Sequence, residues 1–529
     1  MITSKGIRIF VFLLLIGPSM ALAQGTNIDA LLKDLRVVSE DGRNLIELKL
    51  SEVLQMALER SNLIKQAQFG EKIAASQLMN AQQGNSPVLV NKGELGRSLS
   101  TSASTENFTN LIRSEATTLS SEYKKRTRSG IEYSFKFTEI QSSYGVLGIP
   151  SPGDAPQEIA GPSDPLHINA LSSSVTIPLG QGLGTEVGEI PIRLGEIGVR
   201  RSHYLSQRDA MTVLRLVAQV YWKMVELRER KRVQQKGVEL SEQLLQDNQD
   251  RLRAGVLSPS DVKVSETQLA RDRLALFQLN SEILRSEDEA RTVLNLENFD
   301  YGLLPSDTPG VHQPQESFDV LLERTFSNHP DLGLTRAAVE VNQQQLLSAE
   351  NKDKTDLSLK FYYTMNGYSN GPFGGTSGFS ESDLAGYGAS VTWNLPLFDD
   401  TSAQNLAMKQ FERQQLILQE NSVKSQLSVQ LQSLIRSLRL AKNEVETAQT
   451  AVRLAEDLLQ NELQRLRLGR STSYRVAQAQ QDAALAKRQE IVSRVAAERT
   501  FLEFLILTNG LHQHYGLNLP SIIQTNPGQ

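Results

Sequence analysis

A long duplicated segment constrains this chain more than any other feature. Residues 238–255, VELSEQLLQDNQDRLRAG, return as residues 452–469, VRLAEDLLQNELQRLRLG, with ten identities in eighteen aligned positions. The copies lie 214 residues apart. Self-similarity over so long a period predicts two related halves rather than a short-period solenoid.

Both halves carry the same order of patterns. Residues 50–83 and 318–350 place apolar residues at near-helical spacing, and two segments of period-two alternation follow in each half. A long tract with apolar residues at heptad spacing comes next, clearest from Leu431 to Leu459. We therefore expect a first repeat at 24–316 (helix, strand, strand, long helix, turn, helix), a second repeat at 317–508, and a C-terminal tail at 509–529.

The long helices are expected to end at matching glycines. Gly255 and Gly469 close the tracts predicted at 203–253 and 402–468, and a glycine just past a helix is a common C-cap. A Ser-Pro-Ser-Asp run from Ser258 and a Ser-Thr-Ser run from Ser471 follow, and both are typical of a new helix start. Each half should thus contain a helical hairpin of which the longer arm is on the order of 100 Å.

Four alternating segments, near 131–138, 171–179, 357–365 and 387–397, predict four amphipathic strands. Residues 85–128, which are rich in Ser and Thr, have almost no equivalent in the second half, and no role is assigned to them. The apolar face is expected to point to lipid and carries Tyr133, Phe135, Phe137, Phe361, Tyr363, Tyr387 and Trp393. The opposite face is polar and should line a pore: Glu132, Ser134, Lys136, Thr138, Thr176, Lys360, Thr364, Thr392 and Asn394.

Four strands cannot lie in a membrane alone, because their edge amides would face hydrocarbon without partners. Only a closed barrel satisfies them. The alternative is the edge of a soluble sandwich, but aromatic, roughly ten-residue strands separated by long polar loops favour an outer-membrane barrel. Closure then requires several copies, and a trimer would supply twelve strands.

Composition and the N-terminus are consistent with this reading. A net charge of −5 argues against a nucleic-acid partner. Residues 1–23 have the basic start, apolar run and Ala-Leu-Ala end of a secretory signal peptide, and no stretch long enough for a membrane helix follows. The chain has no cysteine, which excludes disulfides, thiolate metal sites and a lipid-bearing N-terminal cysteine.

These features together resemble the TolC-type outer-membrane efflux channels. The resemblance covers about residues 50–508 except 85–128, and it is most specific in the turn motifs RLRAGVLSPSDVKVSETQLA and RLRLGRSTSYRVAQAQQDAALA and the strand endings VTIPLG and VTWNLPLF. It implies a mainly α-helical homotrimer with a twelve-stranded outer-membrane β-barrel and a periplasmic α-barrel of antiparallel coiled-coil helices. It also implies two partners: a periplasmic membrane-fusion adaptor and an inner-membrane pump of RND, ABC or MFS type.

The resemblance assigns roles to the two turns. The adaptor-docking residues it implies are Gly255, Val256, Leu257, Gly469, Arg470 and Ser471. The family often places carboxylates just past the turns, which matches Asp261, whereas the second half has Arg475 at the corresponding position and Gln478 three residues further on. This departure puts an acidic constriction in doubt, and we instead hypothesise that an Asp261–Arg475 ion pair holds the tip shut; the alternative is that both are solvated helix-start residues.

No enzyme is predicted. The run Gly180-Gln181-Gly182-Leu183-Gly184 lacks the third glycine of a dinucleotide-binding loop, and His512 and His514 are not on one helical face, so neither a cofactor nor a metal is expected. The expected function is the passive outer-membrane channel of a tripartite efflux or type I secretion system in a Gram-negative bacterium. The alternative is a periplasmic coiled-coil adaptor or tether without a pore.

Overall fold

The computed structural model describes residues 36–517 except 41, 106–107, 150–154, 156, 161–162, 297–300, 381–383, 396 and 398–399. The signal peptide expected at 1–23 lies outside these residues. The helices are α2 (Leu50–Arg60), α3 (Asn62–Gln83), α4 (Thr185–Gly188), α5 (Ile190–Arg253), α6 (Pro259–Val293), α7 (Phe318–Asn328), α8 (Pro330–Lys352), α9 (Thr401–Arg467), α10 (Ser473–Leu507) and α11 (Leu511–Tyr515), with a 3-10 turn η1 (Gly374–Ser380). The strands are β1 (Val37–Glu40), β2 (Arg43–Leu48), β3 (Val88–Thr105), β4 (Phe108–Arg126), β5 (Glu132–Ile149), β6 (Gln157–Ala160), β7 (Leu166–Pro178), β8 (Gly302–Pro305), β9 (Asp356–Ser369) and β10 (Ala385–Asn394).

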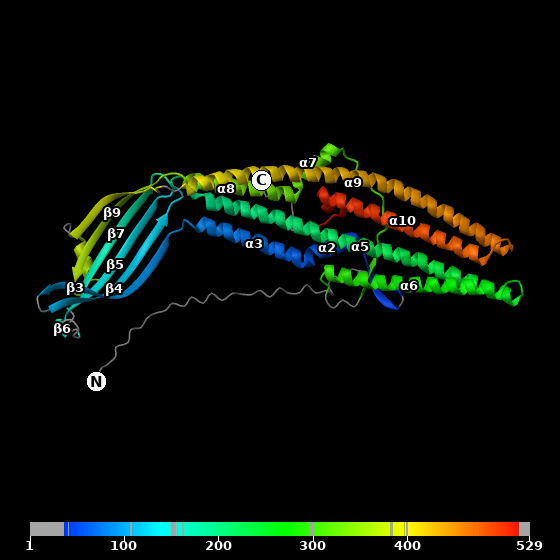
Figure 1. Ribbon diagram of the computed structural model, residues 1–529, viewed down its shortest axis with the longest axis horizontal. Helices are drawn as coiled ribbons and strands as arrows, with labels where there is room; N and C mark the ends of the chain where they lie inside the picture. The colour runs from blue at the N-terminus through cyan, green and yellow to red at the C-terminus, as the bar shows by residue number, and fades with distance from the viewer. Residues whose placement is uncertain are drawn as a thin grey trace, which may run out of the picture.

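The molecule is elongated (Figure 1). A large β-sheet lies at one end, and the two turns that connect α5 to α6 and α9 to α10 lie at the other. The two long helices, α5 with 64 residues and α9 with 67, run nearly the whole helical length. At 1.5 Å per residue each is on the order of 100 Å long. Near the sheet, α3, α5, α8 and α9 form one layer in that order, and at the far end α6 packs on α5 and α10 packs on α9.

The sheet corrects the expected number of strands. It contains seven strands, of which six form a continuous antiparallel path in the order β10-β9-β7-β5-β4-β3, and β6 pairs with one end of β5. The expectation of four strands per chain is therefore wrong. The segment at 85–128 that had no assigned role forms the hairpin β3–β4, and β4 pairs with β5 along 18 positions, from Arg126↔Glu132 to Thr109↔Ile149. This pairing extends β5 to Ile149, past the point where its apolar alternation fades.

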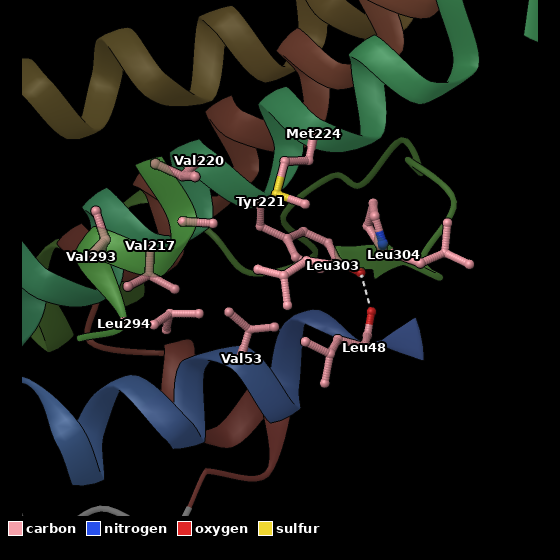
Figure 2. Close-up of a pocket in the computed structure, with 12 residues that line it drawn as sticks. Leu48, Val53, Val217, Val220, Tyr221, Met224, Val293, Leu294, Leu303 and Leu304 are labelled. Carbon is pink, nitrogen blue, oxygen red and sulfur yellow. Dashed lines mark hydrogen bonds between the residues drawn. The ribbon is translucent and has the colours of Figure 1, made fainter. Parts of the chain in front are cut away.

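The hydrophobic core lies near the middle of the helices. It joins α2, α5, α9 and α10 to a small sheet, β1-β2-β8, in which β8 pairs in parallel with β2 although 250 or so residues separate them. Leu54, Leu431 and Leu502 are fully buried there. A cavity of about 20 Å³, lined by Val53, Val217 and Leu303, remains inside this core (Figure 2). Its volume is close to that of one water, and its walls are apolar, as in cavities that stay dry.

Within the described residues, no helix has both the length and the apolar character needed to cross a lipid bilayer.

Candidate functional site

The two turns at the far end have the same backbone geometry. Gly255 has φ +75° and Gly469 has φ +71°, in the left-handed region where a side chain is strained. In the first turn, Gly255 N donates to Leu252 O (2.9 Å) and Val256 N to Arg251 O (2.9 Å). The second turn repeats both bonds, from Gly469 N and Arg470 N. Each long helix thus ends in a Schellman motif, which satisfies its last carbonyls and reverses the chain. We call the two turns, residues 254–258 and 468–472, the tip.

The returning helices begin with different chemistry. Ser258 and Asp261 form a capping box on α6, with Asp261 N 3.4 Å from Ser258 Oγ and Ser258 N 3.3 Å from Asp261 Oδ2. On α10 only the first half of the box is present, since Thr472 Oγ1 accepts from Arg475 N at 3.4 Å. Asp261 and Arg475 are both the third residue of their helix. A carboxylate is favourable there and a guanidinium is not, because the N-terminal end of a helix dipole is positive.

A carboxylate near the end of the preceding helix holds the second turn and feels the charge of Arg475. Glu462, near the end of α9, accepts from Ser471 Oγ at 2.5 Å and from Arg465 Nη1 at 3.0 Å. The Ser471 hydroxyl, together with the positive charges of Arg465 and Arg475, lowers the pKa of the Glu462 carboxyl below its ordinary value. Glu462 therefore remains charged at neutral pH and holds the second turn closed on itself.

The residues expected to form the gate do not meet within one chain. The Asp261 carboxylate binds Ser258, the Arg475 side chain lies near Glu462, and no Asp261–Arg475 ion pair joins them in the part of the chain that the structure describes. Gln478 is exposed and donates to Asp482 Oδ1 at 3.2 Å on its own helix. The Asp261–Arg475 pair thus stays a prediction for contacts between copies.

The tip exposes apolar side chains. Val256, expected to dock a partner, is 76% exposed, and Leu468 and Tyr474 beside the second turn are 72% and 66% exposed. Leu468 and Tyr474 were missed from the sequence, although both flank the predicted docking residues. Three large apolar groups held in water at the extreme end of the molecule, on rigid turns, are typical of a surface that binds another protein.

Behind the tip, polar side chains join the two hairpins. Buried Asn248 on α5 donates to Ser265 Oγ of α6 at 2.6 Å and to Ser473 Oγ of α10 at 2.9 Å. Further along, Gln480 on α10 donates to Ser241 Oγ and to Gly237 O, both at 2.9 Å. Near the tip these hydrogen bonds join the hairpins together with an apolar contact of Leu244 on α5 with Leu466 and Val476 of the second hairpin.

The large sheet has one apolar and one polar face. Residues directly opposite in an antiparallel pair share a face, and alternate residues along each strand do so as well. Phe135 opposes Ser173, which opposes Tyr363, which opposes Tyr387. The same registers place all seven residues predicted to face lipid on this one face, and the nine predicted to line a pore on the other.

The hairpin β3–β4 continues both faces. Tyr123 opposes Phe135 and Leu89 opposes Tyr123, so both join the aromatic face, where Leu89 is 63% exposed. On the opposite face, Glu122 opposes Lys136 and accepts from Ser134 Oγ at 2.8 Å.

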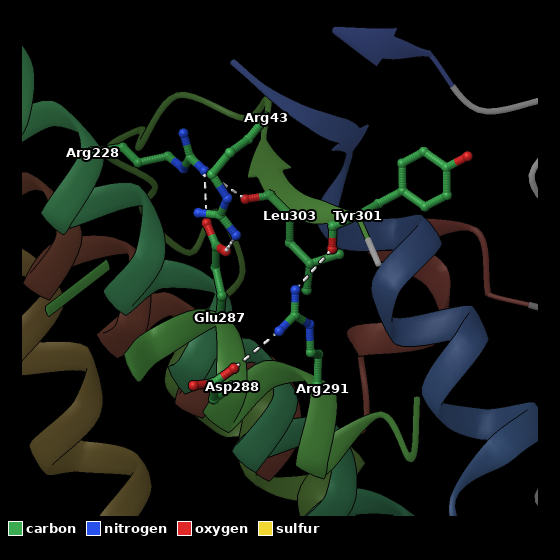
Figure 3. Close-up of polar contacts among 7 residues, drawn as sticks. All are labelled: Arg43, Arg228, Glu287, Asp288, Arg291, Tyr301 and Leu303. Atoms are coloured by element: carbon green, nitrogen blue, oxygen red, sulfur yellow. Dashed lines mark hydrogen bonds and ion pairs between the residues drawn. The ribbon is translucent and has the colours of Figure 1, made fainter. Parts of the chain in front are cut away.

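A buried charge cluster ties the middle of the molecule together. Glu287 on α6 is 1% exposed and accepts from Arg43 Nη2 of β2 and Arg228 Nη2 of α5, both at 3.1 Å (Figure 3). Arg228 Nη2 also donates to Leu303 O of β8 at 2.9 Å. Four elements far apart in the sequence thus converge on one carboxylate. The described residues contain no group of three or more His, Cys, Asp or Glu suited to a metal ion.

Comparison with known proteins gives the fold. No protein-family model and no curated protein match the sequence. Solved structures do match. The Campylobacter jejuni CmeC outer membrane channel aligns over 87% of this chain and 85% of its own, with TM-score 0.62 and 11% identity. The outer membrane protein VceC from Vibrio cholerae aligns over 89% and 97%, with TM-score 0.59 and 13% identity. The open state of the Neisseria gonorrhoeae MtrE outer membrane channel aligns over 90% and 91%, with TM-score 0.55 and 14% identity.

The chain shares their fold. The predicted resemblance to TolC-type channels is confirmed at the level of fold, since these three outer membrane proteins align over 87–90% of this chain. A TolC-like fold accounts for the order of elements: helices α3 and α8 lead into the sheet, and α5 and α9 lead away from it toward the tip.

Proposed function

We propose that this protein is the outer-membrane channel of a tripartite efflux or secretion system, conducting substrates passively from an inner-membrane pump to the exterior. The observation that carries the proposal is the two-faced sheet. Its aromatic face suits contact with lipid, and its polar face suits contact with water. The sheet lies at one end of a helical body that is long enough to cross much of the periplasm. A periplasmic adaptor without a pore would not need such a sheet.

Assembly of three copies is part of the proposal, and the edges of the helical layer support contacts between copies. The outermost helix on one side, α3, exposes Phe69 and Ile73, and the outermost helix on the other, α9, exposes Phe411 and Leu418. Apolar stripes at both edges of one layer fit side-by-side packing of identical copies into a closed ring. Under this proposal the helices enclose a tunnel that is continuous with the polar face of the sheet.

The tip is the proposed docking site for a periplasmic adaptor, through Gly255, Val256, Leu257, Gly469, Arg470 and Ser471, and now also through Leu468 and Tyr474. The glycines supply the turn geometry and the apolar side chains supply the contact area. Opening of the tunnel is proposed to follow from separation of the hairpins when the adaptor binds, with Asp261, Arg475 and Gln478 as candidate gate residues between copies.

Fractionation and conductance test the channel. We expect the protein in the outer membrane, as an oligomer that forms ion-conducting pores in planar bilayers. Val256→Asp should leave the oligomer and its location unchanged but abolish co-purification of the adaptor, because it places a charge in an apolar contact. Lys263→Asp, at an exposed site on the nearby helix α6, is the matched control and should retain the adaptor. Recovery of wild type as a soluble periplasmic monomer would refute the proposal.

A further inference from the structure

We infer that the hairpin β3–β4 is part of the barrel wall, so that the β3 edge of one copy pairs with the β10 edge of a second copy and three copies close a barrel of eighteen strands. This inference rests on the proposed function, because it concerns how that channel closes. It replaces the twelve strands expected from four per copy with six from each of three copies.

The two edges of the sheet need partners. Of the strands that the structure describes, β3 pairs with β4 alone and β10 pairs with β9 alone, which leaves one row of amides and carbonyls free on each. Unpaired backbone groups cost several kcal/mol each in hydrocarbon, so a sheet in the membrane must close. β4 pairs with β5 at 18 positions and so covers the side of β5 that would otherwise be free. β3 pairs with the other side of β4 and is therefore the edge of the sheet.

Strand direction allows this closure. Neighbouring strands along β10-β9-β7-β5-β4-β3 are antiparallel at every step. With six strands, the first and last run in opposite directions, so β3 of one copy and β10 of the next form another antiparallel pair. The face chemistry also matches across the joint. Leu89 and Leu95 on β3 share the lipid-facing side with Val391 and Trp393 on β10, and all four are exposed in the single copy.

The helical layer has the same two edges as the sheet. In order across the layer, α3 lies at one side and α9 at the other, with α5 and α8 between them. β3 follows α3 in the chain and β10 precedes α9, so both layers would join a second copy through the same pair of sides (Figure 1). The exposed apolar stripes on α3 and α9 face this joint under the same arrangement.

The widths of the two layers agree as well. Four helices packed about 8–10 Å apart are roughly 32–40 Å wide. Six strands about 4.8 Å apart and tilted by about 40° cover roughly 38 Å of barrel circumference. Four strands would cover only about 25 Å. A six-strand sheet therefore continues the helical wall at nearly constant width, and the barrel would be about 1.5 times as wide as one of twelve strands, since diameter grows roughly linearly with strand number.

Cysteine cross-linking tests the pairing, and the chain has no cysteine of its own. The test pairs place one cysteine on the pore face of each edge strand: Lys92→Cys or Glu94→Cys on β3 with Ser390→Cys or Thr392→Cys on β10. Within one copy these strands are five spacings apart, roughly 24 Å, whereas a disulfide needs Cβ atoms about 4 Å apart. A bond can therefore form only between copies. On oxidation in outer membranes, we expect at least one β3–β10 pair to give a covalent trimer as the main product.

A matched pair tests the alternative closure. Lys136→Cys on β5 with Ser390→Cys or Thr392→Cys on β10 should not cross-link in the full chain, because the hairpin separates these strands. In a variant that lacks residues 87–127, the same pair should cross-link, because β5 becomes the edge. Cross-linking of β5 to β10 in the full chain, without β3 to β10, would overturn the inference and leave a twelve-stranded channel with the hairpin outside its wall.

Two further outcomes are distinguishable. A covalent dimer as the final β3–β10 product would overturn the count of eighteen, since two copies would then close the sheet. Absence of any cross-link, together with a soluble monomer on fractionation, would refute the proposed function as well as the inference drawn from it.

Discussion

The charge cluster at Glu287 gives the sharpest stability prediction. Glu287→Ala removes a buried carboxylate that accepts one bond from Arg43 and one from Arg228. The side chain of Arg228 is only 11% exposed. In the variant it would retain one acceptor from the cluster, the uncharged carbonyl oxygen of Leu303. At 3.1 Å and an effective dielectric constant of 20, each pair interacts by about 5 kcal/mol before desolvation is subtracted. Breaking a buried pair by removing one partner costs about 3–5 kcal/mol, and we expect a loss in this range.

A control lies two residues away on the same helix. Glu289 binds Lys223 Nζ at 2.8 Å, a shorter contact than either of those to Glu287, but both side chains are about half exposed. Exposed pairs contribute about 0–1 kcal/mol, so Glu289→Ala should have little effect. Comparison of the two variants separates burial from distance as the cause of the loss.

The assay is urea unfolding of the detergent-solubilised protein, followed by helical circular dichroism at one fixed protein concentration, because oligomer stability depends on concentration. Glu287→Ala should lower the midpoint clearly and Glu289→Ala should not. Glu287→Gln, which keeps the shape and one acceptor, should fall between them. Equal midpoints for the two alanine variants would refute the argument that the buried carboxylate joins α5, α6, β2 and β8.

Two more predictions concern single residues. Burial raises the pKa of Glu498 to about 7 from an ordinary 4.5. Between these two pH values the folded state holds a proton that the unfolded state releases. The free energy of unfolding therefore falls as the pH rises from about 4.5 to 7, by about 3 kcal/mol in total. Glu498→Gln should remove this slope from unfolding midpoints measured between pH 4.5 and 8, and an unchanged slope would contradict the assignment. In Gly469→Ala the added Cβ meets no atom within 4 Å, but the alanine must adopt φ +71°, which should cost about 1 kcal/mol. In Gly198→Ala, within helix α5, the added Cβ is equally free of neighbours and the backbone is helical, so this variant should be more stable by about 0.5 kcal/mol. Equal unfolding midpoints for these two variants would show that backbone strain at the tip is absent.

The hairpins and the aromatic strands could be predicted because their signals are local. A glycine after a heptad tract, followed by a Ser or Thr cap, specifies a turn at Gly255 and Gly469 without reference to the rest of the fold. Alternation of Tyr133, Phe135 and Phe137 likewise marks a strand and its aromatic face. The long helix expected at 402–468 spans Thr401–Arg467, within one residue at each end.

The hairpin β3–β4 could not be recognised in the same way. On the side of the aromatic face it carries Gly93, Thr117 and Ser121 among its leucines, so the contrast between faces that identifies a strand is weak. Pairing of β4 with β5 determines the strand conformation and register, which the pattern of the segment itself does not. The gate residues stay a prediction, because equivalent positions in two repeats need not touch within one chain. Asp261 and Arg475 are the third residues of two equivalent helices. Asp261 binds Ser258 in its own turn, and the charge of Arg475 acts on Glu462 of α9.

The seams inside and between the hairpins differ in chemistry, and this decides where opening would cost least. Beside the tip, α9 and α10 bury Leu466 and Val476 against each other, with Leu244 added from α5. Separation of such side chains exposes apolar surface, at about 1.5–3 kcal/mol for each one, and water does not compensate for it. The bonds from Asn248 and Gln480 between hairpins contribute only about 0.5–1.5 kcal/mol net each, because water can replace them. Separating the hairpins near the tip would break these hydrogen bonds and expose Leu244, whereas splitting the second hairpin would expose both Leu466 and Val476. If the tip opens as proposed, the hairpins should therefore move there as intact units.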